Sequence, residues 1–223
     1  QQADGGYVLN GNKSMVAFGG DAKVLVVFAA TQSAAGEDVG VQGFVLAGDT
    51  AGLSFEKEDY MGLRPLPLYA MNLKDVSVPA TAKLHDDFDL KQFHNLSKIA
   101  IAALAVGTCQ AVLDYVVPYV NERVAFGEPI SNRQSVAFMV ADMATELEAL
   151  RLMVYRAAAQ AEQGIDCTRM AFLAHRQAIK YGMKIGTDGI QLLGGHGFTR
   201  EHPVELWYRN LRGLATLDGM LLA

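Results

Sequence analysis

The apolar residues of this chain change their period once, near Asp87. Before that point, short apolar runs alternate with glycine, proline and polar residues, which is typical of β-strands and turns. After it, apolar residues recur every three or four positions over long stretches, as on the buried face of an amphipathic helix. A block of strands followed by a block of helices predicts an α+β fold. We expect a partial β-barrel or sheet domain over residues 1–84 and an antiparallel four-helix-bundle-like domain over residues 85–223.

The first block contains several candidate strands. Tyr7-Val8-Leu9 leads into Asn10-Gly11, which is a strong signal for a two-residue β-hairpin. Pro65 and Pro67 mark a turn, and the stretch from 31 to 40 is expected to be a polar loop. The apolar or alternating runs that predict the other strands cover residues 23–31, 41–46, 53–57 and 69–78.

The second block contains three long apolar stripes. Their members are Leu96, Ile99, Ala103, Val106 and Ala111; then Val136, Met139, Met143, Leu147, Leu150, Val154 and Ala157; then Ala174, Ala178, Tyr181, Ile185, Gly189 and Leu192. Pro118 is expected to kink the first helix. Gly164 and Asp166 separate the second helix from the third, with Asp166 as a candidate N-cap. Pro203 favours the start of a short final helix.

Composition excludes several classes of protein. The 223 residues are 51% hydrophobic, which indicates a globular chain with a sizeable core. The net charge of −5 argues against a nucleic-acid-binding face. The longest unbroken apolar run, residues 99–106, is too short to span a membrane, and no secretory leader is visible. Cys109 and Cys167 lie in helical patterns, and the histidines lack metal-ligand spacing, so we expect no metal site and a cytoplasmic protein.

Two loops carry the candidate chemistry. The stretch from Gln191 to Gly197 places three glycines and an amide side chain directly after a helical pattern. Glycine permits positive φ, and backbone N–H groups exposed in such a loop can cradle a pyrophosphate. A helix C-cap followed by a turn explains the same residues without a ligand. The second loop, Arg123-Val124-Ala125-Phe126-Gly127, lies between two helical patterns, with Arg133-Gln134 just beyond it.

Four segments together resemble the signatures of the acyl-CoA dehydrogenase family. Arg123 to Gly127 resembles that family's Arg-x-x-Phe-Gly loop, and the loop from Gln191 to Gly197 resembles its second signature. The stretch from Gly6 to Lys13 is similar to the middle-domain motif Gly-Tyr-x-Leu-Asn-Gly-x-Lys, and Val76 to Pro79 is similar to the end of that domain. The resemblance covers essentially the whole chain, which looks like the C-terminal portion of a family member.

The resemblance implies a flavoenzyme that removes hydrogen from the α and β carbons of an acyl-CoA thioester. A carboxylate would take the α-proton, the β-hydrogen would leave as hydride to FAD, and an electron-transfer flavoprotein or similar acceptor would receive the electrons. Arg123 would contact the FAD pyrophosphate, Phe126 would pack near the adenosine, and Gln134 would help hold the same part. The residues that would line the pyrophosphate of a neighbouring subunit's FAD are Gln191, Gly194 and Gly195. Such sharing implies a homo-oligomer, a dimer or tetramer.

The resemblance also assigns a base and shows departures. Asp218 stands where the family's common catalytic glutamate does, one methylene shorter, and the position used by other members, on the first long helix, is Ser97. Met15 and Ala17 replace a tryptophan and a threonine that contact the flavin ring in the family; the hydroxyl is absent and backbone N–H groups remain. A polar tail is replaced by Met220-Leu221-Leu222.

Several alternatives stay open. A helix-end ion pair with Glu122 would explain Arg123, and core packing would explain Phe126. The chain could belong to a nitroalkane-oxidase-like or acyl-CoA-oxidase-like flavoenzyme, which also uses a carboxylate to abstract an α-proton. The departures at Met15 and Ala17 and the lost polar tail also fit a non-catalytic or partner-dependent subunit of a hetero-oligomer. The sequence leaves open the acyl group, the electron acceptor, and whether Asp218 is a competent base.

Overall fold

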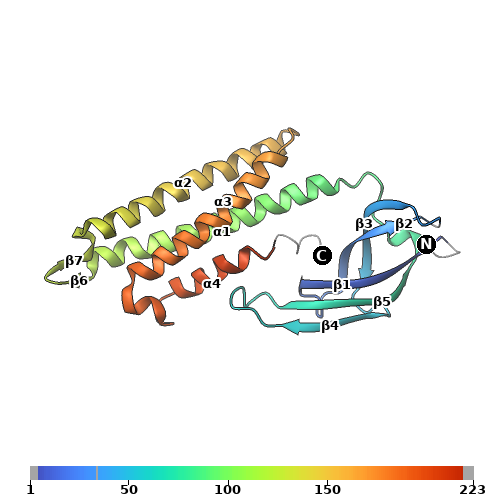
Figure 1. Ribbon diagram of the computed structural model, residues 1–223, viewed down its shortest axis with the longest axis horizontal. Coiled ribbons are helices and arrows are strands. Elements are labelled where there is room, and N and C mark those ends of the chain that lie inside the picture. The colour runs from blue at the N-terminus through green and yellow to red at the C-terminus, as the bar shows by residue number, and fades with distance from the viewer. Residues whose placement is uncertain (1–4, 34, 218–223) are drawn as a thin grey trace. The chain divides into compact units, whose positions relative to one another are not determined.

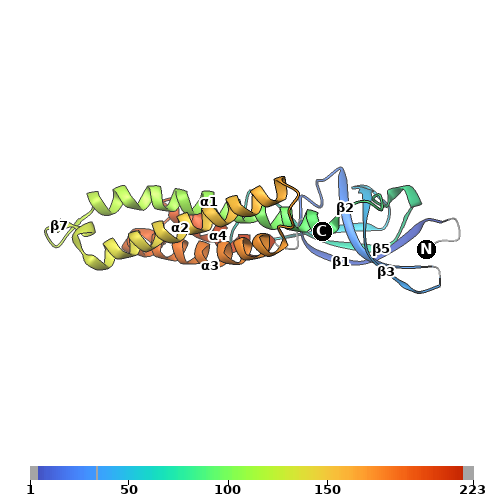
Figure 2. The ribbon, with the colours of Figure 1, turned by 90° about the horizontal axis from the view of Figure 1, so that it is seen from above.

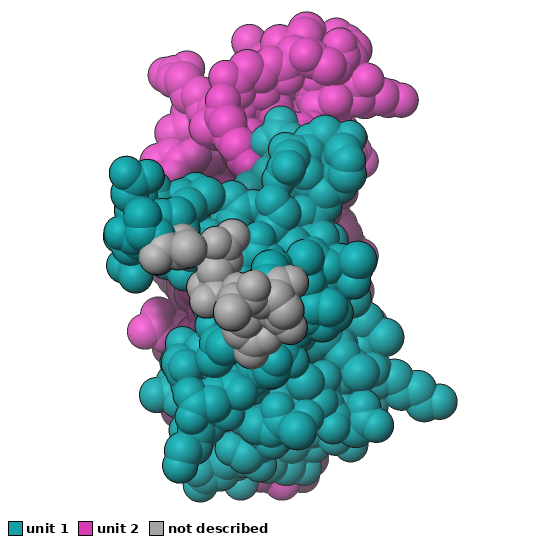
Figure 3. Space-filling view, turned by 90° about the vertical axis from the view of Figure 1, so that its right-hand side faces the viewer, with its two compact units in different colours: residues 1–90, 219–223 teal, residues 91–218 magenta. Residues whose placement is uncertain are grey.

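The computed structural model describes residues 5–33 and 35–217, and these form a mixed α+β fold, as the sequence predicts. Contacts divide the described chain into two compact units, residues 5–90 and 91–217 (Figure 3). The first unit consists of strands with one short 3₁₀ helix, and the second is mainly helical. The boundary expected after residue 84 stays a prediction.

The strand unit contains two antiparallel sheets (Figure 1). Strands β1 (Tyr7–Ala17), β5 (Leu68–Val78) and β4 (Leu53–Glu58) form one sheet in the order β1-β5-β4, and β2 (Val24–Gln32) pairs with β3 (Asp38–Ala47) in the other. The described strands do not close into a barrel. Alternate apolar side chains of both sheets enter one core, whose nearly inaccessible members are Val27, Phe44, Met71 and Val76.

The predicted hairpin at Asn10-Gly11 is wrong. Strand β1 continues through both residues, with a shift of register against β5 between Leu9 and Gly11. The Asn10 side chain donates to the Asp75 carboxylate at 3.1 Å and accepts the Asp75 backbone N–H at 2.7 Å. Asp75 has a left-handed φ of 51°, and Gly11 has a φ of 147°. The local turn signal is therefore accommodated as a β-bulge, in which one strand carries an extra residue.

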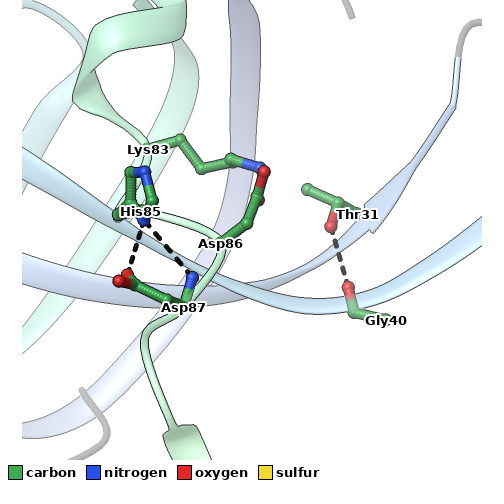
Figure 4. Close-up of polar contacts among 6 residues, drawn as sticks. All are labelled: Thr31, Gly40, Lys83, His85, Asp86 and Asp87. Atoms are coloured by element: carbon green, nitrogen blue, oxygen red, sulfur yellow. Dashed lines mark hydrogen bonds and ion pairs between the residues drawn. The ribbon is translucent and has the colours of Figure 1, made fainter.

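Polar contacts fix the loop between β2 and β3 and the segment after β5 (Figure 4). Thr31 Oγ1 donates to the Gly40 carbonyl at 2.8 Å, so the strands extend further into the expected loop, which shrinks to residues 33–37. After the 3₁₀ helix η1 (Ala80–Ala82), Lys83 pairs with Asp86 and His85 contacts Asp87. The Lys83 ammonium holds the pKa of Asp86 below its ordinary value.

The helical unit contains three long helices and one short one (Figures 1 and 2). They are α1 (Leu90–Glu122), α2 (Gln134–Glu162), α3 (Thr168–Leu192) and α4 (Val204–Leu214). A small hairpin, β6 (Val124–Ala125) and β7 (Glu128–Pro129), and the 3₁₀ helix η2 (Ile130–Asn132) connect α1 to α2. A second 3₁₀ helix, η3 (Gly194–Phe198), follows α3. Helix α1 continues through Pro118 to Glu122.

Helix α3 packs closely because it presents small residues to its neighbours. A Cβ at Gly182 or Gly186 would meet Leu211 of α4 at 3.3 or 3.2 Å. A Cβ at Gly189 would meet a Val112 methyl of α1 at 2.5 Å and a Val204 methyl of α4 at 3.1 Å. The glycines therefore set how near the neighbouring helices lie.

Helix α1 bears on the expectation that the apolar runs of this chain are too short to span a membrane. Its length and composition alone suffice for a membrane span, although the sequence contains no unbroken apolar run of that length. One such helix among the described residues is weak evidence, because the core helix of a soluble protein passes the same test. Val112, Val116 and Val120 of this helix are buried within the protein.

Candidate functional site

The two loops singled out in the sequence line a single cavity in the helical unit. The cavity has a volume of about 450 Å³. The end of α1, the β6–β7 hairpin, the start of α2 and the segment from the end of α3 into η3 form its walls. Of the residues predicted to bind the cofactor, those that line it are Arg123, Phe126, Gln191, Gly194 and Gly195.

The Arg123 loop makes its tight turn at Phe126 and Gly127, which have positive φ values of 58° and 87°. The Ile130 N–H donates to the Arg123 carbonyl at 2.9 Å and closes the hairpin. Phe126 is 92% exposed, and the Arg133 guanidinium lies 5.0 Å from the centre of its ring. Core packing therefore does not explain Phe126. Its ring is free to stack against a planar ligand group.

The glycines after α3 have two different roles. Gly194 has a φ of 58°, and a Cβ at Gly194 or Gly195 would meet nothing within 4 Å. Both are exposed, so their backbone is accessible to a ligand in the cavity. Gly197 is buried, and a Cβ there would lie 2.3 Å from the Ile190 carbonyl oxygen. The first two glycines open the cavity, and the third lets the chain turn back on α3.

The charge of the cavity is positive. Its lining contains the guanidinium groups of Arg123 and Arg133, and none of the described lining residues is acidic. Arg133 has one carboxylate nearby, that of Glu128 at 3.8 Å. Within the described part of the chain Arg123 forms no ion pair, so the helix-end pair with Glu122 is not made. A guanidinium without a carboxylate partner, beside the exposed backbone of Gly194 and Gly195, suits a phosphate or diphosphate.

A tyrosine–histidine cluster adjoins this cavity, and sequence reasoning did not identify it. Tyr119 Oη lies 3.0 Å from His196 Nδ1, and Tyr115 Oη lies 2.7 Å from His202 Nδ1. The two imidazole rings stack with their centres 5.2 Å apart and their planes 26° apart. Trp207 meets Tyr115 edge-on at 6.0 Å. The spacing of the tyrosines, one turn apart and with Tyr119 one turn before Arg123, was the available signal.

The remaining predicted site residues lie elsewhere. Gln134 is exposed as the first residue of α2 and is not part of the cavity lining. Met15 and Ala17 belong to the strand unit. Met15 has a left-handed φ of 59°, and its N–H donates to the Glu58 carboxylate at 3.2 Å. Asp218 lies outside the described residues.

A second cavity of the helical unit, of about 510 Å³, lies between the beginnings of α1 and α3. Its lining carries the cations Lys91, Lys98 and Arg169. One carboxylate, that of Asp166, lies 3.1 Å from the Lys91 ammonium. This cavity also has a positive balance of charge. No group of three or more metal-ligating side chains occurs among the residues that the structure describes.

Comparisons with known proteins agree with this architecture. Residues 1–76 match the family profile "Acyl-CoA dehydrogenase, middle domain", and residues 90–221 match "Acyl-CoA dehydrogenase, C-terminal domain". The chain is 35% identical, over 97% of its length, to a short-chain-specific acyl-CoA dehydrogenase of Megasphaera elsdenii. It is 32% identical, over 96% of its length, to the CarC subunit of the caffeyl-CoA reductase–Etf complex of Acetobacterium woodii.

A solved structure of an FAD-dependent dehydrogenase matches with a TM-score of 0.88 and 28% identity, covering 99% of this chain and 60% of that one. The chain spans 57% of the length of each of the two sequence relatives. The two profiles match in the order of the strand unit and the helical unit, and the same two loops that resemble the family's signatures line one cavity. The chain belongs to the acyl-CoA dehydrogenase family.

Proposed function

We propose that the protein catalyses FAD-dependent α,β-dehydrogenation of an acyl-CoA thioester. One observation carries the proposal: the fold brings both signature loops to one cationic cavity whose described lining has no carboxylate. Because Arg123 and the Gly194-Gly195 backbone share that cavity, both can hold the same diphosphate. The exposed ring of Phe126 provides a face for the adenine, and Gln191 adds an amide to the same wall.

The chain's own residues have binding and proton-transfer roles in this reaction. FAD, when bound, supplies the acceptor for the hydride. Arg123, which has no described ion pair to give up, neutralises diphosphate charge without losing an existing partner. Asp218 is the proposed base that takes the α-proton of the thioester. Asp218→Asn should then keep FAD and lose turnover; a variant with full activity would refute this assignment.

The second cavity supports a phosphorylated substrate carrier. Lys91, Lys98 and Arg169 place three cations around about 510 Å³ with one carboxylate, a balance that favours an anionic group such as the phosphates of coenzyme A. The relatives' names agree with acyl-CoA substrates, one of them short-chain specific, and one relative acts in a complex with Etf. We propose an electron-transfer flavoprotein as the acceptor and a homo-oligomeric enzyme.

The absorption spectrum of the full-length protein tests the proposal. Flavin bands should be present and should bleach when a short-chain acyl-CoA is added without oxygen. Arg123→Gln should lower FAD occupancy, whereas the matched control Arg176→Gln, at an exposed position of α3 outside the cavity lining, should not. Equal FAD content in both variants would contradict the assigned role of the cavity.

One observation favours a second candidate, a subunit that depends on a partner. The Met15 N–H, which could have replaced a lost side-chain contact to a flavin ring, donates to Glu58. Ala17 offers no hydroxyl, and its backbone pairs with Leu68 in the sheet. Absence of flavin bands in the purified protein, with activity regained on adding a homologous chain, would select this alternative.

A further inference from the structure

The stacked histidines adjoin the proposed diphosphate cavity but play no part in the function proposed above. His196 lies in η3 and lines the cavity, whereas His202 precedes α4 and is not part of the lining. Each ring presents Nδ1 to a tyrosine hydroxyl of α1. The histidines thus have similar bonds but different access to a ligand.

The hydrogen-bond network assigns different tautomers to the two rings. Tyr119 Oη also lies 3.3 Å from the Leu193 carbonyl and donates to it, so its oxygen can accept Nδ1–H from His196. Tyr115 Oη bonds no other group in the described part of the chain, so its hydroxyl hydrogen is available to Nδ1 of His202. This arrangement favours the Nε2–H tautomer of His202, in which Nδ1 accepts the Tyr115 hydroxyl hydrogen. The donation from Tyr119 to Leu193 favours the Nδ1–H tautomer of His196, whose Nε2 has no partner among the described residues.

The stacked pair carries at most one positive charge, because two imidazolium rings whose centres lie 5.2 Å apart would repel each other. In these tautomers the ring nitrogen that is free to take a proton is Nε2 of His196, so the charge is placed on His196. We propose that His196 is a proton-dependent third cation of the diphosphate cavity, and that the bond from Tyr115 keeps His202 neutral beside it. This inference rests on the diphosphate site of the proposed function.

The groups around His196 set the direction of its pH dependence. Tyr119 of α1 and His202 before α4 contact His196 directly, and Tyr115 contacts His202. Arg123 and Arg133 line the same cavity as His196, and Glu128 pairs with Arg133. A bound diphosphate places negative charge among these cations, so protonation of His196 and diphosphate binding favour each other. Affinity should be high in acid and fall as pH rises through the imidazole range, between about pH 5 and 8.

ADP-ribose is the appropriate probe. Its diphosphate is esterified at both ends and does not titrate in this range, unlike a terminal phosphate, whose second ionisation lies near pH 6. Calorimetric titration of the full-length protein, freed of flavin, should show about tenfold weaker binding near pH 8 than near pH 5.5, because a neutral imidazole offers the diphosphate no opposite charge.

Two variants and one control isolate the role of His196. His196→Gln keeps a polar side chain that can bond Tyr119 and should make the affinity independent of pH. His202→Gln replaces a ring that the proposal keeps neutral, so the pH dependence of the affinity for ADP-ribose should remain. His85→Gln, at an exposed histidine of the strand unit, should keep the wild-type profile. Nitrogen NMR of the wild-type imidazoles gives a second measurement that needs no variant, with Nδ1–H expected for His196 and Nε2–H for His202.

The outcomes separate this inference from the proposed function. Absence of ADP-ribose binding at every pH would contradict the diphosphate site itself. Binding with equal affinity near pH 5.5 and 8 would overturn the role of His196 and leave the site intact. A pH dependence that survives in His196→Gln, or the opposite tautomers by NMR, would also overturn it.

Discussion

Gly189→Ala offers a quantitative test of the packing around α3. The added Cβ would lie 2.5 Å from a Val112 methyl and 3.1 Å from a Val204 methyl. Both valines are fully buried, so neither can swing into solvent to make room. Overpacking of this kind costs about 1–3 kcal/mol. Alanine recovers roughly 0.5–1 kcal/mol through its better helix propensity. We expect a net loss of about 1–2 kcal/mol in the free energy of unfolding.

The clash can be separated from the propensity by changing its partner. Val112→Ala alone should destabilise by about 2 kcal/mol, through lost burial and the cavity it leaves. In that background, Gly189→Ala no longer meets the Val112 methyl, and the remaining 3.1 Å contact with Val204 is offset by the gain in helix propensity of about 0.5–1 kcal/mol. The two substitutions should therefore couple by about 1–2 kcal/mol. Gly107→Ala, at an exposed position in α1 where a Cβ meets nothing within 4 Å, is the matched control and should stabilise.

Urea unfolding followed by far-ultraviolet circular dichroism measures all four variants against the wild type. A Gly189→Ala protein as stable as Gly107→Ala would show that α3 shifts away from its neighbours without cost. Additive effects of Gly189→Ala and Val112→Ala would refute the assignment of the clash to that valine.

Three further predictions follow from local chemistry. Bonds from Thr168 lower the pKa of Asp166 to about 2 from 3.8. The Asp166 carboxylate therefore contributes its full stabilisation above pH 3.8, and this contribution is lost as the pH falls toward about 2. Asp166→Asn should be less stable than the wild type at neutral pH, and a difference in stability that persisted near pH 2 in acid titration would contradict this. Burial raises the pKa of Cys109 to about 12, so the native thiol should resist iodoacetamide at pH 8 and react after unfolding, as mass spectrometry can show. Asn10→Ala removes both bonds to Asp75 and should lower stability by roughly 1 kcal/mol, whereas an unchanged urea midpoint would show that the bulge does not depend on them.

The sequence predicted the elements whose signals repeat along the chain. Every apolar stripe of the second block became a helix, because many positions reinforce one period. The signal at Asn10-Gly11 failed because it rests on two residues, and Asp75, 65 positions away, bonds the asparagine in an extended strand. Local turn chemistry cannot reveal such a distant partner.

The candidate site was predicted in part for a similar reason. Arg123 and the loop from Gln191 to Gly195 could be named from their motifs, but that they share a cavity depends on where α1 and α3 end. The exposure of Phe126 follows from two consecutive left-handed residues, which its sequence neighbours did not indicate. His196 sits within the recognised loop, yet its partners Tyr119 and His202 come from other elements.

Trp207 gives the helical unit an optical property of its own. It is the single tryptophan of this chain, and its ring meets Tyr115 edge-on with the ring centres 6.0 Å apart. When the indole is excited at wavelengths that tyrosine does not absorb, the emission of this chain therefore comes from one place, beside the stacked histidines. An imidazolium quenches indole emission more strongly than a neutral imidazole does. The indole fluorescence of this chain is therefore a label-free signal from the contact between α1 and α4, to which α2 and α3 contribute no indole.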